Sequence, residues 1–227
     1  MTAPVDMQRA SGAVRELLVA LGLDPAEAQY ARTPELVAQA YAEWCAGVGK
    51  DPLPGLRESL LPVGTATGEM VALRDIEFTA LCVHHLLPFH GRAHLAYLPG
   101  QHIAGLGALA RTVALLAARP QTQEQLGEQI AQALQEGLAA RGALVVLEAR
   151  QGCVSDRGVK QQAARSVTVA ARGAFCESSR QNAAITLLCG LGGAVVVSGA
   201  DLAEEIEIAG GSAIFGAKLA EAGGGAA

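Results

Sequence analysis

Apolar side chains recur every three or four positions in the first part of the chain, which is the spacing of one face of a helix. Residues 12–48 are therefore predicted to form two helices. Thr33 followed by Pro34 predicts the start of the second helix, with Thr33 as its N-cap. Residues 49–68 are rich in proline and glycine, and we expect a linker or an irregular arm there.

From residue 69 onward the pattern changes to one of strands and helices that occur in pairs. The predicted strands are 70–81, 91–99, 143–149 and 164–175, and the predicted helices are 105–119 and 123–140. Thr122 and Gln125 have the spacing of a capping box in front of the second of these helices. The order β-β-α-α-β-β predicts an α+β fold, in which the helices cover one face of a sheet. The open edges of that sheet favour an oligomer that extends it.

The chain is expected to divide into three parts. Residues 1–68 form an N-terminal helical region with its linker, residues 69–178 form the α+β domain, and residues 179–227 form a Gly/Ala-rich extension that is partly disordered. The apolar stretch 185–200 is interrupted by glycines and is shorter than the roughly 20 residues of a membrane helix. It predicts a buried segment or a subunit contact.

Composition excludes some classes of function. The net charge of −5 argues against a protein that binds nucleic acid through its phosphates. The five cysteines are an odd number spread along the chain, and the N-terminal residues lack an apolar leader segment. We therefore expect reduced thiols and a cytoplasmic protein with no membrane partner.

Most of the chemistry lies in one short stretch, in which Cys82 and His85 have the spacing of a pair of metal ligands. Cys153 follows a predicted strand and is the candidate third ligand. Three protein ligands would leave the fourth position of a zinc ion open, which is typical of catalytic sites. The alternative is a buried Cys82 beside a histidine that is satisfied within the core.

Several motifs, in the right order, resemble the GTP cyclohydrolase I family across residues 10–178. They are "AVRELLVALGLDPAEAQYARTPE", "LCVHHLLPFHGRAHLAYLP", "IAGLGALAR", "ARPQTQEQLGEQIAQALQE", "VVLEA" and "CVSDRGV". The resemblance implies the tunnelling fold, a β-barrel built by several subunits, a homodecamer, and active sites between subunits. It also implies opening of the imidazole ring of GTP at C8, loss of formate, and reclosure as dihydroneopterin triphosphate.

The resemblance also assigns roles to residues. Cys82, His85 and Cys153 match the zinc ligands, and His84 matches a residue that donates or accepts a proton. Gln123 and Glu124 match the pair that binds the guanine edge. Arg111 and Arg157 match the arginines that contact the triphosphate. A carboxylate can accept hydrogen bonds from both N1–H and the 2-amino group, so Glu124 would select guanine. His90, His94 and His102 match no catalytic role and are interpreted as surface or strand residues.

The chain departs from the family pattern at positions that matter for chemistry. Gln151 replaces a histidine near the purine, and an amide cannot transfer a proton near neutral pH. Leu36 and Ala108 replace two cations that contact phosphate, which would cost about 3–6 kcal/mol of binding. The remaining departures are Val83 for a glutamate, Gly107 for a serine and Gln161 for a lysine.

Three hypotheses follow. In the first, the protein is a divergent zinc hydrolase that opens the ring of a guanine nucleotide or guanine derivative, stops at a ring-opened pyrimidine, and acts in specialised metabolism. In the second, it is the ordinary enzyme of folate and pterin synthesis. In the third, it is a non-catalytic ring that binds purines or pterins.

Overall fold

A computed structural model describes residues 5–63 and 69–190 of the chain. Its main sheet has five strands in the order β5-β2-β3-β6-β7. Four of them are antiparallel neighbours, and the short β5 pairs with β2 in parallel. The strands are β2 (Val71–Cys82), β3 (Pro88–Leu98), β5 (Pro120–Gln121), β6 (Gly142–Gln151) and β7 (Ser166–Gly173).

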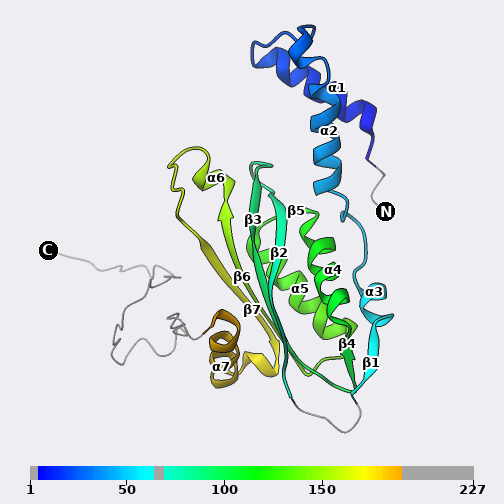
Figure 1. The fold of residues 1–227 in the computed structure, drawn as a ribbon, viewed down its shortest axis with the longest axis vertical. Coiled ribbons are helices and arrows are strands. Elements are labelled where there is room, and N and C mark those ends of the chain that lie inside the picture. Colours follow the sequence, from blue (N-terminus) through cyan, green and yellow to red (C-terminus); the bar gives the residue numbers. More distant parts are fainter. Residues whose placement is uncertain (1–4, 64–68, 191–227) are drawn as a thin grey trace, which may run out of the picture.

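Two helices, α4 (Leu106–Ala117) and α5 (Gln123–Gly137), cover one face of this sheet (Figure 1). Side chains alternate along a strand, so every second residue of β3 and β6 points into the core beneath the helices. The predicted order β-β-α-α-β-β is confirmed. The capping box of Thr122 and Gln125 is also confirmed, with both reciprocal hydrogen bonds present.

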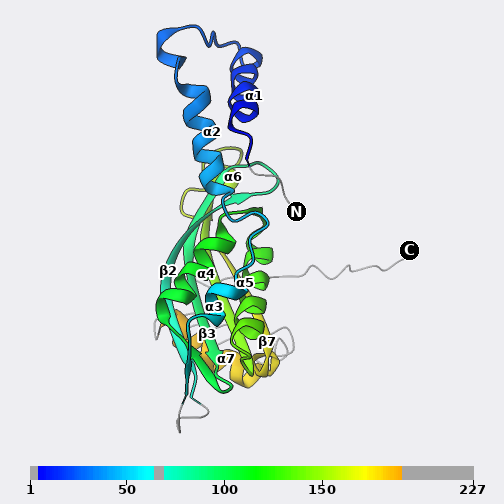
Figure 2. The same cartoon turned by 90° about the vertical axis from the view of Figure 1, so that its right-hand side faces the viewer.

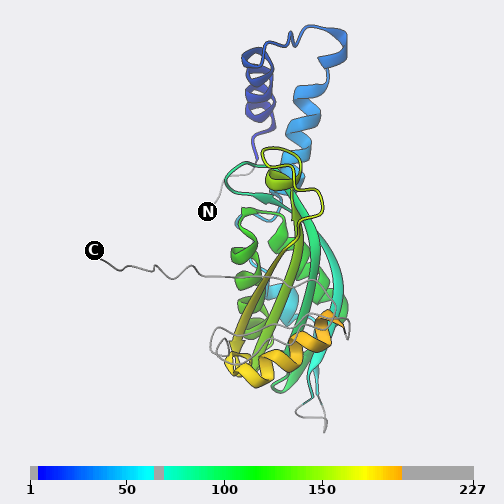
Figure 3. The same ribbon diagram turned by 90° about the vertical axis from the view of Figure 1, so that its left-hand side faces the viewer.

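The lower part of the other face is covered by α7 (Ser178–Cys189), which follows the 3-10 turn η2 (Ala174–Cys176) and crosses the strands (Figure 3). Ile185 and Leu188 are buried there against the sheet, which fits the buried-segment alternative for the start of the apolar stretch 185–200. Residues 191–200 of that stretch lie outside the described residues. The first part of the predicted C-terminal extension is therefore a packed helix. The remainder of the extension, residues 191–227, lies outside the described residues, so the prediction of partial disorder there is not tested.

The N-terminal region is a helical hairpin that projects from the body (Figures 1 and 2). It contains α1 (Met7–Ala20), the 3-10 turn η1 (Ala28–Tyr30) and α2 (Thr33–Trp44), so the two predicted helices are confirmed. The prediction of Thr33 as N-cap is wrong by one position. Arg32 occupies the cap without a side-chain hydrogen bond, because Thr33 already has helical geometry and Pro34 fits the first turn.

The predicted irregular arm contains two short elements. They are α3 (Leu53–Arg57) and β1 (Leu60–Pro62), which pairs with β4 (His102–Ala104). Leu56 is fully buried, so contact with the body orders a segment whose composition suggested a loop. Within the described residues, no helix combines the length and the apolar character needed to cross a membrane.

Candidate active site

The three predicted metal ligands converge at the edge of the sheet where β2 ends and β3 begins. The ligand atoms of Cys82, His85 and Cys153 all lie within 4.8 Å of one another. Zinc bound to sulfur at about 2.3 Å and to nitrogen at about 2.0 Å separates two such ligands by about 3.6 Å. The distance from Cys82 Sγ to His85 Nδ1 is 3.7 Å. Two thiols and one imidazole in this arrangement fit a zinc ion with one open position.

The turn between β2 and β3 carries Cys82 and the histidine pair. Cys82 is the last residue of β2, where its N–H donates to the carbonyl of Leu87 at 2.9 Å. The N–H of Leu86 donates back to the carbonyl of Cys82 at 2.8 Å. Because these two bonds close the turn, the three-residue spacing brings the imidazole of His85 back toward the thiol.

His84 shares this turn. Its Nδ1 lies 3.8 Å from Cys82 Sγ, and its ring stands edge-on to the ring of His85. Both histidines are exposed, so their remaining nitrogens can reach a substrate. This is the position from which His84 could donate or accept a proton.

Cys153 is delivered by α6 (Gly152–Ser155), a single helical turn after β6. A Cβ on Gly152 would stand 2.5 Å from the carbonyl of Pro88, so only glycine permits this turn to approach the start of β3. Burial, followed by the charge of the neighbouring Cys82, raises the pKa of the Cys153 thiol. A cation between the two sulfurs would offset both effects.

The short strand β5 links this turn to the helix that carries Glu124. Cys82 pairs with Gln121 in the parallel ladder, and the N–H of Val83 donates to the carbonyl of Gln121 at 3.2 Å. Thr122 then caps α5, so Glu124 lies in its first turn, three residues from the partner of a metal ligand. The exposed carboxylate of Glu124 lies at the rim of a pocket of about 420 Å³.

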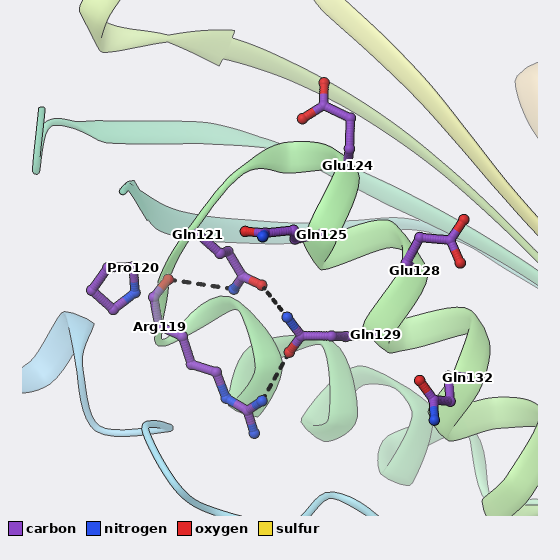
Figure 4. A pocket seen from close by; sticks show the side chains of 8 residues that line it. All are labelled: Arg119, Pro120, Gln121, Glu124, Gln125, Glu128, Gln129 and Gln132. Carbon is purple, nitrogen blue, oxygen red and sulfur yellow. Dashed lines mark hydrogen bonds between the residues drawn. The ribbon is translucent and has the colours of Figure 1, made fainter. Parts of the chain in front are cut away.

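Polar side chains line this pocket (Figure 4). The amide of Gln129 donates to Gln121 at 3.0 Å and accepts from Arg119 at 2.8 Å. Glu124 points away from this chain of hydrogen bonds (Figure 4). Among the described residues its exposed carboxylate has no side-chain hydrogen-bond partner, so it is available to a ligand there.

Gln123 and Gln151, both predicted to be site residues, are joined to each other. Gln123 is only 3% exposed, and its amide nitrogen lies within hydrogen-bonding distance of the carbonyls of Leu147 and Ser166. Its amide oxygen accepts from Gln151 at 2.7 Å and from the hydroxyl of Ser166. The side chain of Gln123 is therefore committed to the protein, which leaves Glu124 as the member of the pair that is available to a ligand.

The two predicted phosphate-binding arginines are both exposed. Arg157 follows α6, and its charge partly opposes the rise in the Cys153 pKa that burial and Cys82 cause. Arg111 lies on α4, and its guanidinium would be 3.2 Å from a Cβ on Gly107. Leu36 is exposed on α2, whereas Ala108 is buried in the core beneath α4.

Sequence reasoning missed residues that support the site without binding a metal or a purine. Ser166 bonds both Gln123 and Gln151, and Asp156 bonds Arg150 and Ser155 around the α6 turn. Tyr41 reaches the turn that carries His85 from the N-terminal hairpin. Serine, aspartate and tyrosine are common surface residues, so only their tertiary contacts identify them.

Comparison with known proteins supplies further evidence. The family described as GTP cyclohydrolase I matches residues 10–189. A GTP cyclohydrolase 1 from Leifsonia xyli subsp. xyli is 50% identical over 82% of this chain and 97% of its own length. A GTP cyclohydrolase 1 from Thermobifida fusca is 45% identical over 83% of this chain and 91% of its own length. Among solved structures, the archaeosine synthase QueF-Like in its apo form matches 46% of this chain and 93% of its own, with 10% identity and a TM-score of 0.36.

Proposed function

Because the chain belongs to the GTP cyclohydrolase I family, we propose that it is a zinc-dependent hydrolase that opens the imidazole ring of a guanine nucleotide at C8. The protein is an enzyme with the tunnelling fold of that family. The observation that carries the proposal is the group Cys82, His85 and Cys153, held one short strand away from Glu124.

Each residue has a role that follows from its position. The two thiols and the imidazole would hold zinc, which when bound supplies Lewis-acid activation of water near neutral pH. Glu124 would accept hydrogen bonds from N1–H and the 2-amino group of guanine, and so orient the ring. His84, beside the ligands, would donate or accept the proton that accompanies cleavage of the C8–N bond.

The residues around the site also bear on which product forms and how many phosphates the substrate carries. Gln151 supports the divergent hypothesis, because its amide is engaged with Gln123 and cannot transfer a proton. Ring opening would then continue, and the later proton transfers toward a pterin would slow. Leu36 and Ala108 offer no cation to a triphosphate, whereas Arg111 and Arg157 are exposed and available. The second candidate, an ordinary enzyme that forms dihydroneopterin triphosphate, is favoured by the close relatives of that name.

We also propose a homo-oligomer in the cytoplasm, with the family's decamer as the expected size. The support is the sheet itself, since β7 has a single partner, β6, within the described part of the chain. An unpaired edge of this length is normally covered in a stable protein. Light scattering of the full chain at micromolar concentration would test the expected mass.

Incubation of the zinc-loaded protein with GTP, GMP, guanosine and guanine, followed by mass spectrometry, tests the reaction. We expect a ring-opened or reclosed product from at least one of them. Formate should be released only where a second water hydrolyses the formamide that ring opening leaves. The C153S variant is the control for contaminating activity. If only GTP reacts and dihydroneopterin triphosphate forms at an ordinary rate, the divergent hypothesis is wrong and the second candidate stands.

A further inference from the structure

A hydrogen bond joins the N-terminal hairpin to the metal-binding turn. Tyr41, in the last turn of α2, donates its hydroxyl hydrogen to the backbone carbonyl of Leu86 at 3.1 Å. Leu86 directly follows His85 in the turn between β2 and β3. Figures 1 and 2 both show the lower end of α2 next to the upper ends of these strands.

The residue that Tyr41 contacts has an unfavourable backbone conformation. Leu86 has φ of 52°, in the left-handed region that residues with a Cβ normally avoid. Such a conformation persists only where surrounding contacts hold it. Within the turn, the hydrogen bonds Leu86 N–H to Cys82 and Cys82 N–H to Leu87 provide part of this restraint. The carbonyl of Leu86 is held from outside the turn, by Tyr41.

Tyr41 is itself restrained. Its ring stands edge-on to that of Trp44, with 5.4 Å between centroids and an interplanar angle of 87°. Both residues are half-buried on the same helix, so the position of the hydroxyl follows the position of α2. Any displacement of the hairpin therefore acts on the carbonyl of Leu86.

We propose that Tyr41 is a positioning residue for the metal centre, which keeps the turn in the conformation that brings His85 to Cys82. The hairpin thereby sets the metal affinity of a site that it does not itself ligate. This inference rests on the proposed zinc centre. Residues that orient metal ligands typically change affinity by about 10- to 100-fold when they are altered.

The test uses the Tyr41→Phe variant of the full chain, which removes only the hydroxyl. We expect its Zn²⁺ affinity, measured by competition with a chromophoric chelator, to fall about tenfold. Tyr30→Phe, which alters a tyrosine that precedes α2, is the matched control and should retain the wild-type affinity. Circular dichroism of each variant checks that it is folded.

A second substitution separates positioning from a general loss of stability. Leu86→Gly removes the cost of a left-handed φ, because glycine adopts this region freely. In the Tyr41→Phe background it should restore most of the Zn²⁺ affinity, whereas Leu86→Ala should not. The absorption spectrum of bound Co²⁺ depends on the geometry of the site. It should differ from the wild-type spectrum in Tyr41→Phe and return toward it when Leu86→Gly is added.

The outcomes are distinguishable. Wild-type protein that binds no Zn²⁺ would contradict the proposed function itself. If Tyr41→Phe binds Zn²⁺ as tightly as the wild type, the role of Tyr41 is wrong but the proposed zinc site stands. A loss of affinity in Tyr41→Phe that Leu86→Gly fails to restore would overturn the claim that Tyr41 acts through Leu86.

Discussion

The amide nitrogen of Gln151 lies 2.7 Å from the amide oxygen of Gln123, and 3.2 Å from the hydroxyl of Ser166. This pair fixes the orientation of the Gln151 amide. Its nitrogen is directed toward Gln123, and no hydrogen bond from the described residues reaches its oxygen. The amide oxygen of Gln151, two positions before the proposed metal ligand Cys153, is therefore a hydrogen-bond acceptor with a fixed orientation that does not titrate.

Replacing Gln151 with histidine should introduce a titratable group at this position. We expect kcat/KM of Gln151→His to fall as the pH drops below about 6.5, because the ring then gains a proton and loses an acceptor. Wild-type protein should lack this component. Steady-state rates between pH 5.5 and 8 would check it, and superimposable profiles for the two proteins would contradict it.

Glu124→Gln should weaken binding of guanine compounds by roughly 10- to 100-fold, because one lost hydrogen bond to a charged group costs about 1.5–3 kcal/mol. The variant should also lose discrimination against inosine, which lacks the 2-amino group. Calorimetric titration with guanosine and inosine measures both effects. Glu136→Gln, an exposed position farther along α5 that does not line the pocket, is the matched control and should bind like wild type.

Cys153→Ser should abolish stable zinc binding and ring opening together, because a hydroxyl is a poor substitute for a thiolate ligand. Elemental analysis after dialysis measures the metal content. Cys176→Ser is the control, since this exposed cysteine lies beyond β7 and outside the ligand group. Equal zinc content in the two variants would show that Cys153 is not a ligand.

Asp156→Asn should loosen the turn that presents Cys153. Asp156 accepts from Arg150 at 2.8 Å and from Ser155 at 2.7 Å, and the Ser155 hydroxyl, followed by Arg150, lowers its carboxyl pKa. We expect a few-fold weaker zinc affinity by chelator competition. Asp75→Asn, which breaks a comparable exposed pair with Arg92, should leave zinc affinity unchanged.

His94 should make the stability of the fold depend on pH. Burial lowers the pKa of His94. The charges of Arg74 and Arg92 also lower this pKa, whereas those of Asp75 and Glu148 raise it. The Nδ1 atom of His94 accepts a hydrogen bond from the N–H of Asp75 at 3.2 Å. The unfolded chain therefore binds this proton at higher pH than the folded chain. The contribution of His94 is fully present above the unfolded pKa of about 6.5, and is lost as pH falls toward the folded value.

The corresponding measurement is urea unfolding of wild type and His94→Gln at pH 5, 6, 7 and 8. Glutamine can still accept from Asp75 but does not titrate, so the variant should lose less stability between pH 7 and pH 5. Identical pH dependence in both proteins would contradict the assignment.

Local patterns predicted much of this molecule because they express short-range physics. The capping box at Thr122 depends on residues three apart, and strand alternation depends on the pleat of the backbone. The same reasoning failed for residues 53–57 and 60–62, where Leu56 is ordered by burial against the body rather than by its neighbours in sequence. It also placed the N-cap of α2 at Thr33, one residue after the observed cap Arg32, because capping and first-turn positions share the same residue types.

The sequence by itself determined which groups could serve as ligands, since two thiols and an imidazole suit zinc wherever they meet. That Cys153 meets Cys82 was decided by the tertiary structure, through the register of β3 with β6 and the close approach that Gly152 permits. The commitment of Gln123 to the core and the contact of Tyr41 with Leu86 were likewise decided there. Contacts between distant residues depend on how whole elements pack, and no local period records that packing.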